Sequence, residues 1–312
     1  MLRAGGIKEH AGVIIFCMAF VILNGRVLDD SEATLPVLDW GILYGFGLFE
    51  TMRAYGGWVF RLEDHLRRLS DSAKEIGLPL KEGGDALARY IRLALSVNSL
   101  SDAFVRLTVT YGIGGPRLEF NEDAKPNVFA VARALPENIV ELQKKGVKLS
   151  VSGKYVRDPE SPLTYIKSTN YLLNALAKRE AKEAGVYDML LLNKEGFVAE
   201  TSTANIFTVA DGKLLTPPTT RGLLPGITRK TVLELSKKEG IKAGEEDLTL
   251  EDVASADEVF ITNSTLELIP VVSVDEKKVG SGKPGKMSRK LAGAYRKLVV
   301  EETRGRGLHP RT

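Results

Sequence analysis

The sequence predicts an α+β fold arranged as two domains. Turn signals such as Asn24-Gly25 and Asp211-Gly212 join apolar segments into hairpins, and these hairpins outnumber strand–helix–strand units. Amphipathic segments at helical spacing accompany the strands, and the chain of 312 residues is 44% hydrophobic and 27% charged, which is enough to bury substantial cores. We therefore expect antiparallel sheets with helices packed on them, rather than a doubly wound parallel sheet.

The first domain is predicted to extend over residues 18–134. Hairpin turns at Asn24-Gly25 and Gly56-Gly57 each join two apolar segments, as in antiparallel strands. Residues 63–76 carry apolar side chains at helical spacing, and a second helix is expected near residues 86–97. The expected strands are residues 19–23, 26–30, 49–55, 58–62, 103–111 and 127–135.

The polar stretch of residues 135–146 is predicted to be a linker, and the larger second domain follows it as residues 147–312. Turns at residues 194–196 and 211–212 again separate apolar strands. The expected strands are residues 147–156, 187–193, 197–201, 204–217, 257–263 and 267–279. The expected helices are the segment after Lys167 and residues 228–239, 249–255 and 285–303.

The N-terminal residues 1–17 are predicted to be a dispensable extension. Residues 11–23 form an apolar run of 13 residues, which is too short to span a bilayer. Basic residues precede this run as in a signal peptide, but no small-residue cleavage site follows it. Met18 stands directly before the first hairpin. Cys17 is the only cysteine, so no disulfide can form within the chain. We expect a cytoplasmic protein with no membrane partner.

Charge and metal-ligand content exclude two classes of function. The 43 Lys and Arg residues are interspersed with 40 Asp and Glu residues, and the net charge of +3 gives no basic stripe for nucleic acid. His10, His65, His309 and the single cysteine are not clustered at metal-ligand spacing, so no metal site is expected. The expected partner is a small molecule.

Lys167, in the segment YIKSTNYLLN, is the first candidate for chemistry. It lies where an extended apolar approach turns into a helix, which Ser168 is expected to cap and whose apolar face includes Tyr171. The ordinary interpretation is a surface lysine with a buried stem, and this segment alone favours it. A catalytic amine requires a carboxylate, phosphate ligands and an electron sink elsewhere in the chain.

Glu200 is the candidate carboxylate. It closes the apolar strand FVAET and is followed by small hydroxyl residues. A solvated strand end is the commoner situation for a glutamate. The alternative is a buried partner of a cationic ring nitrogen, kept ionised by the opposite charge and oriented by Asn205.

Three segments are candidates for binding a phosphate. The Pro225-Gly226 turn leads directly into a helix whose first turn holds Ile227 and Thr228, where free N–H groups and the positive end of the helix dipole favour an anion. Arg68 lies on the first predicted helix, whereas its neighbour Arg67 is expected to face solvent. Ser264 lies at the end of a strand. Each segment also has an ordinary interpretation as a helix start, a solvated helix face or a turn.

Taken together, these residues resemble the class IV family of pyridoxal-phosphate enzymes. The family signature begins with a glutamate, a small residue, an asparagine and an aromatic residue. It continues with L-x-T and ends on hydrophobic-x-Gly-hydrophobic-x-basic. Its positions here are Glu200, Ser202, Asn205, Ile206, Phe207, Leu214, Thr216, Leu224, Gly226, Ile227 and Arg229. Every fixed position and spacing is met, and the resemblance covers nearly the whole chain.

The resemblance implies a role for each candidate residue. Lys167 is expected to form a Schiff base with pyridoxal 5'-phosphate, and Glu200 is expected to contact the pyridine nitrogen. The expected phosphate ligands are Arg68, Ile227, Thr228 and Ser264. Tyr171 is expected near the ring oxygen, and Leu223 or Leu224 is expected against the ring. The resemblance also implies a homodimer of the fold-type-IV, D-amino-acid-aminotransferase-like architecture, whose larger domain has a mainly antiparallel, barrel-like sheet.

Three subgroups of the family are considered. Thr51 stands where branched-chain aminotransferases usually have glycine and aminodeoxychorismate lyases have threonine. Tyr111 stands where D-amino-acid aminotransferases have a carboxylate-binding arginine. Arg106 aligns with an arginine of branched-chain enzymes and some lyases. These three residues and Tyr44 are the predicted substrate contacts.

The expected activity is that of the lyase, which converts 4-amino-4-deoxychorismate to pyruvate and 4-aminobenzoate, a folate precursor. The alternative is amino transfer to 2-oxoglutarate, from branched-chain amino acids first and from D-amino acids second. A non-catalytic binding protein is a more remote alternative.

Overall fold

The computed structural model describes residues 9–10, 13–14, 19–121 and 123–304. Most of the predicted extension, residues 1–17, lies outside the described residues, which there form only the two short strands β1 (Glu9–His10) and β2 (Val13–Ile14). The chain divides into two compact units, defined here as unit 1 and unit 2. Unit 1 contains the chain up to Leu135, residues Ser168–Asn170 and the chain from Glu302. Unit 2 contains Pro136–Lys167 and Tyr171–Glu301.

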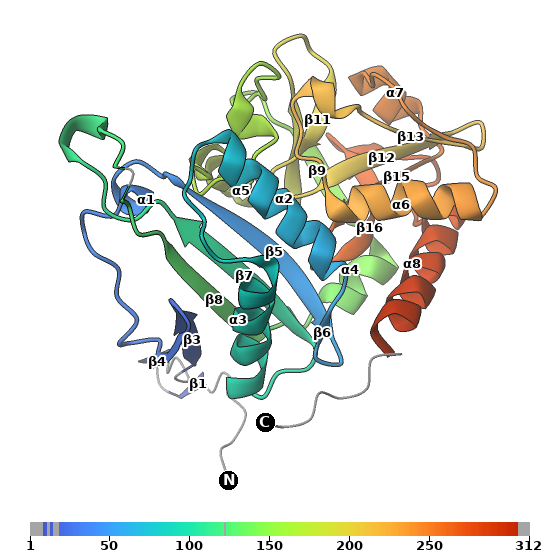
Figure 1. The fold of residues 1–312 in the computed structure, drawn as a ribbon. Helices are drawn as coiled ribbons and strands as arrows, with labels where there is room; N and C mark the ends of the chain where they lie inside the picture. Colours follow the sequence, from blue (N-terminus) through green and yellow to red (C-terminus); the bar gives the residue numbers. More distant parts are fainter. Residues whose placement is uncertain (1–8, 11–12, 15–18, 122, 305–312) are drawn as a thin grey trace. The chain divides into compact units, whose positions relative to one another are not determined.

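Unit 1 is built on a six-stranded antiparallel sheet with the order β4-β3-β8-β7-β5-β6. Helices α2 and α3 pack on this sheet (Figure 1). The strands are β3 (Phe20–Leu23), β4 (Arg26–Asp29), β5 (Gly47–Tyr55), β6 (Trp58–Val59), β7 (Ala103–Thr110) and β8 (Asn127–Ala134). The helices are α1 (Trp40–Leu43), α2 (Leu62–Glu75), α3 (Gly84–Val97) and the 3-10 turn η1 (Pro116–Leu118).

Side-chain alternation along β5 and β7 fixes which residues face the helices of unit 1. Leu48 and Met52 pair with Val109 and Val105 on one face, and all four are fully buried. Because successive strand residues point to opposite faces, Thr51 lies on the other face.

Unit 2 contains a closed barrel of six strands within a nine-stranded sheet. The ring runs β11-β10-β9-β16-β15-β12 and closes because Glu200 on β11 pairs with Asn205 on β12. Strand β9 pairs in parallel with β10 and β16, whereas the other ring pairings are antiparallel. The ring strands are β9 (Val147–Val151), β10 (Asp188–Leu192), β11 (Val198–Thr201), β12 (Asn205–Ala210), β15 (Glu258–Asn263) and β16 (Glu267–Val274). Strands β13 (Lys213–Thr216), β14 (Ala243–Glu245) and β17 (Lys277–Lys278) extend the sheet.

Aliphatic side chains of the barrel strands form a buried core, and helices pack on the barrel strands. Leu149, Leu190, Ile206, Ile261 and Ile269 belong to one buried cluster. Helix α5 packs on β10 through a second cluster of small and aliphatic residues. The helices and 3-10 turns are α4 (Ile139–Lys145), η2 (Pro162–Thr164), α5 (Leu172–Glu183), η3 (Thr219–Arg221), α6 (Ile227–Lys238), α7 (Leu250–Ser255) and α8 (Lys286–Arg304).

The expected α+β class with mainly antiparallel sheets is confirmed, with two local differences. The helix after Lys167 begins at Leu172, and Ser168 does not cap it. Instead, Ser168 pairs with Leu48, and the Thr169 amide donates to the Gly47 carbonyl over 2.8 Å, so these backbone groups extend β5 rather than a helix. The predicted linker, residues 135–146, contains helix α4, which packs on β16.

Within the part of the chain that the structure describes, no helix is long and apolar enough to cross a membrane. The predicted cytoplasmic location stays a prediction. The same described residues hold no group of three or more His, Cys, Asp and Glu side chains that could bind a metal ion. The expectation that the protein has no metal site stays a prediction.

Candidate functional site

Three polar residues form a row across neighbouring strands of the barrel in unit 2. Glu200 pairs with Asn205, and Asn205 pairs with Thr262 on β15, so all three side chains lie on one face. Ile206 and Ile261 are the next residues along their strands and turn to the apolar core. Glu200, Asn205 and Thr262 are each at most 5% exposed, although two of them keep an unsatisfied oxygen. The buried row therefore has hydrogen-bonding capacity left for a ligand.

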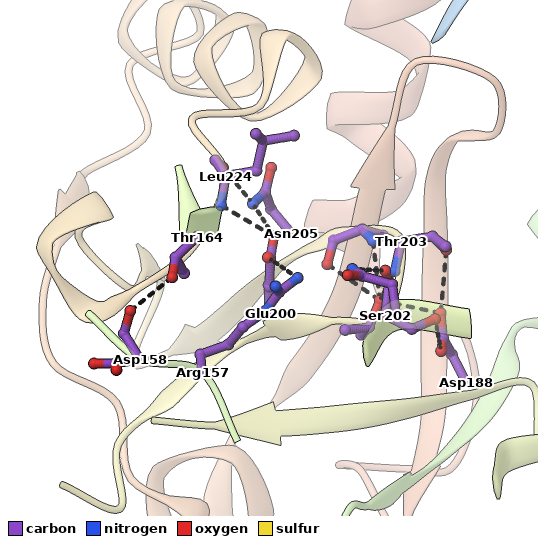
Figure 2. Close-up of polar contacts among 12 residues, drawn as sticks. Arg157, Asp158, Thr164, Asp188, Glu200, Ser202, Thr203, Asn205 and Leu224 are labelled. Carbon is purple, nitrogen blue, oxygen red and sulfur yellow. Dashed lines mark hydrogen bonds and ion pairs between the residues drawn. The ribbon is translucent and has the colours of Figure 1, made fainter. Parts of the chain in front are cut away.

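Glu200 is bound at one oxygen and incompletely satisfied at the other. Its Oε2 accepts from Asn205 Nδ2 over 3.2 Å and from the Leu224 amide over 3.3 Å (Figure 2). Its Oε1 receives no aligned hydrogen bond, although Arg157 Nη2 lies 2.6 Å away as an ion-pair partner. Burial raises the pKa of Glu200, and the positive charges of Arg157 and Lys167 only partly offset this rise. The site thus favours a further cationic donor at Oε1.

The loop before α6 packs directly on this row. Asn205 Nδ2 donates to the Leu224 carbonyl over 2.9 Å, and a Cβ atom on Gly226 would meet Asn205 Oδ1 at 2.0 Å, so only glycine fits there. Leu223 is fully buried. Helix α6 then begins at Ile227 without a side-chain cap, which leaves the N–H groups of its first turn available to an anion, with Thr228 beside them.

Lys167 and Tyr171 flank a short irregular segment before α5. The ammonium of Lys167 lies 5.3 Å from the centre of the Tyr171 ring. The positive charge of Lys167 acts on the Glu200 carboxylate and offsets part of the rise in the pKa of Glu200 that burial causes. The structure therefore brings Lys167, Tyr171, Glu200, Leu223 and the start of α6 together within unit 2.

Ser264 lies in the turn between β15 and β16, directly after the strand that holds Thr262. Asn263 Oδ1 shapes this turn by accepting from the Thr265 and Leu266 amides over 3.1 and 2.8 Å. Asn263 Nδ2 donates to the Thr203 carbonyl over 3.3 Å, which attaches the turn to the segment after Glu200. The phosphate contact of Ser264 stays a prediction.

Arg68 belongs to unit 1, where it pairs with a buried glutamate. Its Nε and Nη2 donate to Glu50 Oε1 and Oε2 over 2.8 and 2.7 Å, and His65 Nδ1 lies 2.7 Å from Oε2. Burial alone raises the pKa of Glu50, but the charges of Arg68 and His65 and their hydrogen bonds outweigh it and lower the pKa to about 2. Arg67 lies on the exposed side of α2, as expected. The phosphate contact of Arg68 stays a prediction.

The predicted substrate residues of unit 1 fall into two groups. Thr51 and Arg106 are direct partners across β5 and β7, and the Arg106 guanidinium lies 3.6 Å from the centre of the Phe49 ring on the same face. Tyr111 is instead enclosed in an aromatic cluster, where it stacks on Trp40 and its hydroxyl contacts the backbone of residue 121. Tyr44 packs edge-on against Trp40.

Sequence reasoning missed three residues around Glu200. Arg157 and Thr262 contact or flank it only because the barrel brings distant strands together. Asp188, at the head of β10, binds the turn that follows Glu200. An acidic residue at the edge of the apolar segment YDMLLLN is the sequence signal that marks Asp188.

Comparison with known proteins gives the same picture. A family model described as "Amino-transferase class IV" matches residues 47–274. The chain is 39% identical over 278 residues to a putative branched-chain-amino-acid aminotransferase of Methanocaldococcus jannaschii, covering 89% of this chain and 96% of the relative. It is 32% identical over 283 residues to the D-alanine aminotransferase of Bacillus licheniformis, covering 91% and 98%.

Solved structures agree with these relatives. The branched-chain amino acid aminotransferase of Escherichia coli superposes with a TM-score of 0.87 at 31% identity, covering 92% of this chain and 96% of that one. The enzyme of that name from Thermobaculum terrenum, solved in its PLP form, has a TM-score of 0.81 at 27% identity and covers 92% and 96%. The resemblance to fold-type-IV enzymes is thereby confirmed. The protein belongs to the class IV amino-transferase family.

Proposed function

We propose that the protein is a pyridoxal-phosphate-dependent transaminase whose amino donors are branched-chain amino acids. The buried row of Glu200, Asn205 and Thr262 is the observation that supports binding of this cofactor. Glu200 Oε1 lacks an aligned donor, and a protonated pyridine nitrogen supplies one. The uncapped start of α6, which contacts the row through Gly226, suits the phosphate. The residues present therefore fit the cofactor at both of its ends.

Four site residues of unit 2 have a defined task in this proposal. Pyridoxal phosphate, when bound, supplies an electron-accepting ring joined to the protein through its aldehyde. Glu200 holds the proton on the ring nitrogen, and Arg157 helps to keep Glu200 ionised. Lys167 would hold the cofactor through its amine. Once the substrate's amino group has displaced that amine from the cofactor, the free amine of Lys167 would take the proton from the substrate Cα as a general base. Leu223 excludes water next to this site.

The transaminase proposal replaces the lyase expectation. The lyase expectation rested on local sequence features such as Thr51, whereas the relatives and solved structures match the chain along about nine tenths of its length and are named as aminotransferases. Their agreement over the whole fold outweighs these local features. Branched-chain donors come first because the relative at 39% identity carries that name. The Tyr111 hydroxyl contacts backbone rather than offering the cation of a carboxylate-binding arginine, which places D-amino acids second.

A direct assay tests the proposal. The purified protein, loaded with pyridoxal phosphate, is expected to form glutamate from 2-oxoglutarate with leucine, isoleucine or valine faster than with D-alanine. Borohydride treatment followed by peptide mapping is expected to find the cofactor on Lys167. Release of 4-aminobenzoate from 4-amino-4-deoxychorismate without leucine turnover would restore the lyase, and the absence of any visible absorbance from bound cofactor would contradict both activities.

We also propose that the protein forms a homodimer. Unit 1 exposes a set of large apolar side chains on and near α1 and the segment after β7, and such clusters mark interaction surfaces. They are Val37, Leu38, Ile42, Leu43, Ile113, Leu118 and Phe120. Light scattering is expected to give twice the chain mass of 34.1 kDa. Replacing Leu38 and Phe120 by serine is expected to shift the population toward the monomer; an unchanged mass would remove this surface from the interface.

A further inference from the structure

The turn that closes the barrel is held by one buried carboxylate. Residues Thr201–Ala204 join β11 to β12, directly between Glu200 and Asn205. Asp188, at the start of β10, has no exposed surface and points at this turn (Figure 2). Neither the family signature nor the proposed mechanism gives Asp188 a task.

Three consecutive hydroxyl groups of the turn converge on Asp188. Ser202 Oγ donates to Oδ1 over 2.5 Å, and the Thr201 and Thr203 hydroxyls lie 3.2 and 3.3 Å from Oδ2. Oδ1 also accepts from the Met189 amide over 2.8 Å, and Lys178 Nζ lies 3.5 Å from Oδ2. Asp188 fixes the turn chiefly through Ser202, because Ser202 is fully buried and its hydroxyl would be left unsatisfied without the carboxylate.

The same turn contacts two other segments of the site. Its Ser202 carbonyl accepts from Asn174 Nδ2 over 2.6 Å, and Asn174 lies on α5, the helix that follows Lys167 and Tyr171. Its Thr203 carbonyl accepts from Asn263, which begins the turn that carries Ser264. The turn is thus a junction between the segments that hold the amine, the ring-nitrogen partner and a predicted phosphate ligand.

We propose that Asp188 is a positioning residue that sets the place of the Glu200 carboxylate toward the cofactor's pyridine nitrogen. This inference rests on the proposed function, since it presumes that the cofactor binds at Glu200. Asp188 itself does not touch the cofactor. It acts through the Thr201–Ala204 turn, whose ends are the Glu200–Asn205 pair.

Asparagine cannot replace Asp188 in this arrangement. Its side chain has one acceptor oxygen and one NH₂ group that only donates. With the NH₂ group at the Oδ1 position it faces the Met189 amide, and at the Oδ2 position it faces the Lys178 ammonium. Both neighbours are donors, so either orientation leaves an unfavourable contact and loosens the turn.

Cofactor affinity separates positioning from a general loss of stability. The dissociation constants of wild type and Asp188→Asn are measured for pyridoxal phosphate and for its deaza analogue, in which a C–H group replaces the pyridine nitrogen. By analogy with residues that orient metal ligands, we expect Asp188→Asn to weaken pyridoxal-phosphate binding about tenfold. Binding of the deaza analogue, which has no contact for Glu200 to lose, is expected to change much less. Amide exchange of residues 202–205 in the cofactor-free variant is expected to be faster.

Met189→Ala is the matched control. Met189 lies next to Asp188 on β10 and packs on α5, so its truncation destabilises the same strand without removing a ligand of the turn. It is expected to lower the melting temperature and to leave the ratio of the two dissociation constants at the wild-type value. Ser202→Ala, which keeps the carboxylate, is expected to reproduce a smaller change of that ratio and decides the question if Asp188→Asn does not fold.

Two outcomes overturn distinct claims. If Asp188→Asn or, in its place, Ser202→Ala changes both affinities equally or neither, Asp188 is not a positioning residue and the proposed function stands. If the wild-type protein binds no pyridoxal phosphate, the proposed function itself fails.

Discussion

Glu50 in unit 1 and Glu200 in unit 2 are both buried glutamates beside an arginine, yet their pKa values shift in opposite directions. Burial is nearly complete for both, at 1% and 4% exposure. Glu50 receives two aligned bonds from Arg68 and a contact from His65, all within 2.8 Å, and its pKa falls to about 2. Glu200 accepts two longer hydrogen bonds at Oε2, and Arg157 Nη2 lies 2.6 Å from Oε1 without the alignment of a hydrogen bond; the pKa of Glu200 rises.

The two glutamates share burial and a neighbouring arginine, so they differ in the number and alignment of the donors that reach each carboxylate. A fully satisfied carboxylate stabilises the fold and has little capacity left for a ligand. An incompletely satisfied one remains costly until a further cation arrives. Glu50 therefore has the properties of a structural anchor for Arg68, whereas Glu200 has those of a binding residue.

The largest expected effect is on catalysis, from Glu200→Gln. The amide cannot hold a proton on the ring nitrogen by charge, so turnover of leucine is expected to fall by about a hundredfold or more, as when a transition-state contact is removed. Glu183→Gln, an exposed change at the end of α5, is the control and is expected to leave turnover unchanged. Turnover within threefold of wild type in Glu200→Gln would show that Glu200 is not the ring-nitrogen partner.

The next effect is on stability, from Glu50→Gln. This change leaves Arg68 without its ionic partner and is expected to lower the free energy of unfolding by about 3 kcal/mol at pH 7. The folded pKa of Glu50 lies below the ordinary value of 4.5, so its stabilising contribution is present above pH 4.5 and is lost as the pH falls toward about 2. Urea unfolding from pH 7 to pH 3 is the measurement.

The free energies of unfolding of wild type and Glu50→Gln are expected to converge as the pH falls through that window, because the wild type loses the contribution of ionised Glu50. Glu75→Gln, an exposed change on α2, is expected to have no effect on the free energy of unfolding. A difference that stays constant with pH would mean that Glu50 is not ionised in the folded protein.

These two glutamates also show what the sequence predicts and what it does not. The linear signature locates Glu200, Asn205 and the start of α6, because their spacing along the chain is itself the constraint. The partner of Glu200 at Oε1, Arg157, lies in a loop without periodicity and reaches Glu200 only once the barrel closes. Glu50 reads as one residue of an alternating strand, and nothing local in the sequence marks its contact with α2.

The start of α5 shows the same limit from the side of local structure. Ser168 has the sequence position of a helix cap, but the backbone of residues 168–169 pairs with β5 instead. Tertiary pairing overrides the local preference and keeps Lys167 on an irregular segment ahead of the helix. A prediction based on capping propensity alone cannot detect a strand that lies more than a hundred residues earlier in the chain.

The smallest expected effect is on the stabilisation that cofactor binding provides, and it comes from Arg157→Met. This change removes the ion-pair partner of Glu200 Oε1. In the cofactor-free protein this change leaves Glu200 buried without its ion-pair partner, whereas the bound cofactor offers its protonated ring nitrogen to the same carboxylate. Pyridoxal phosphate should therefore stabilise the variant more than it stabilises the wild type, by about 1 kcal/mol, or about 2–4 °C of additional thermal shift. Arg179→Met, an exposed change on α5, is the control. A thermal shift smaller than that of the wild type would mean that Arg157, rather than the cofactor, is the cation that Glu200 requires.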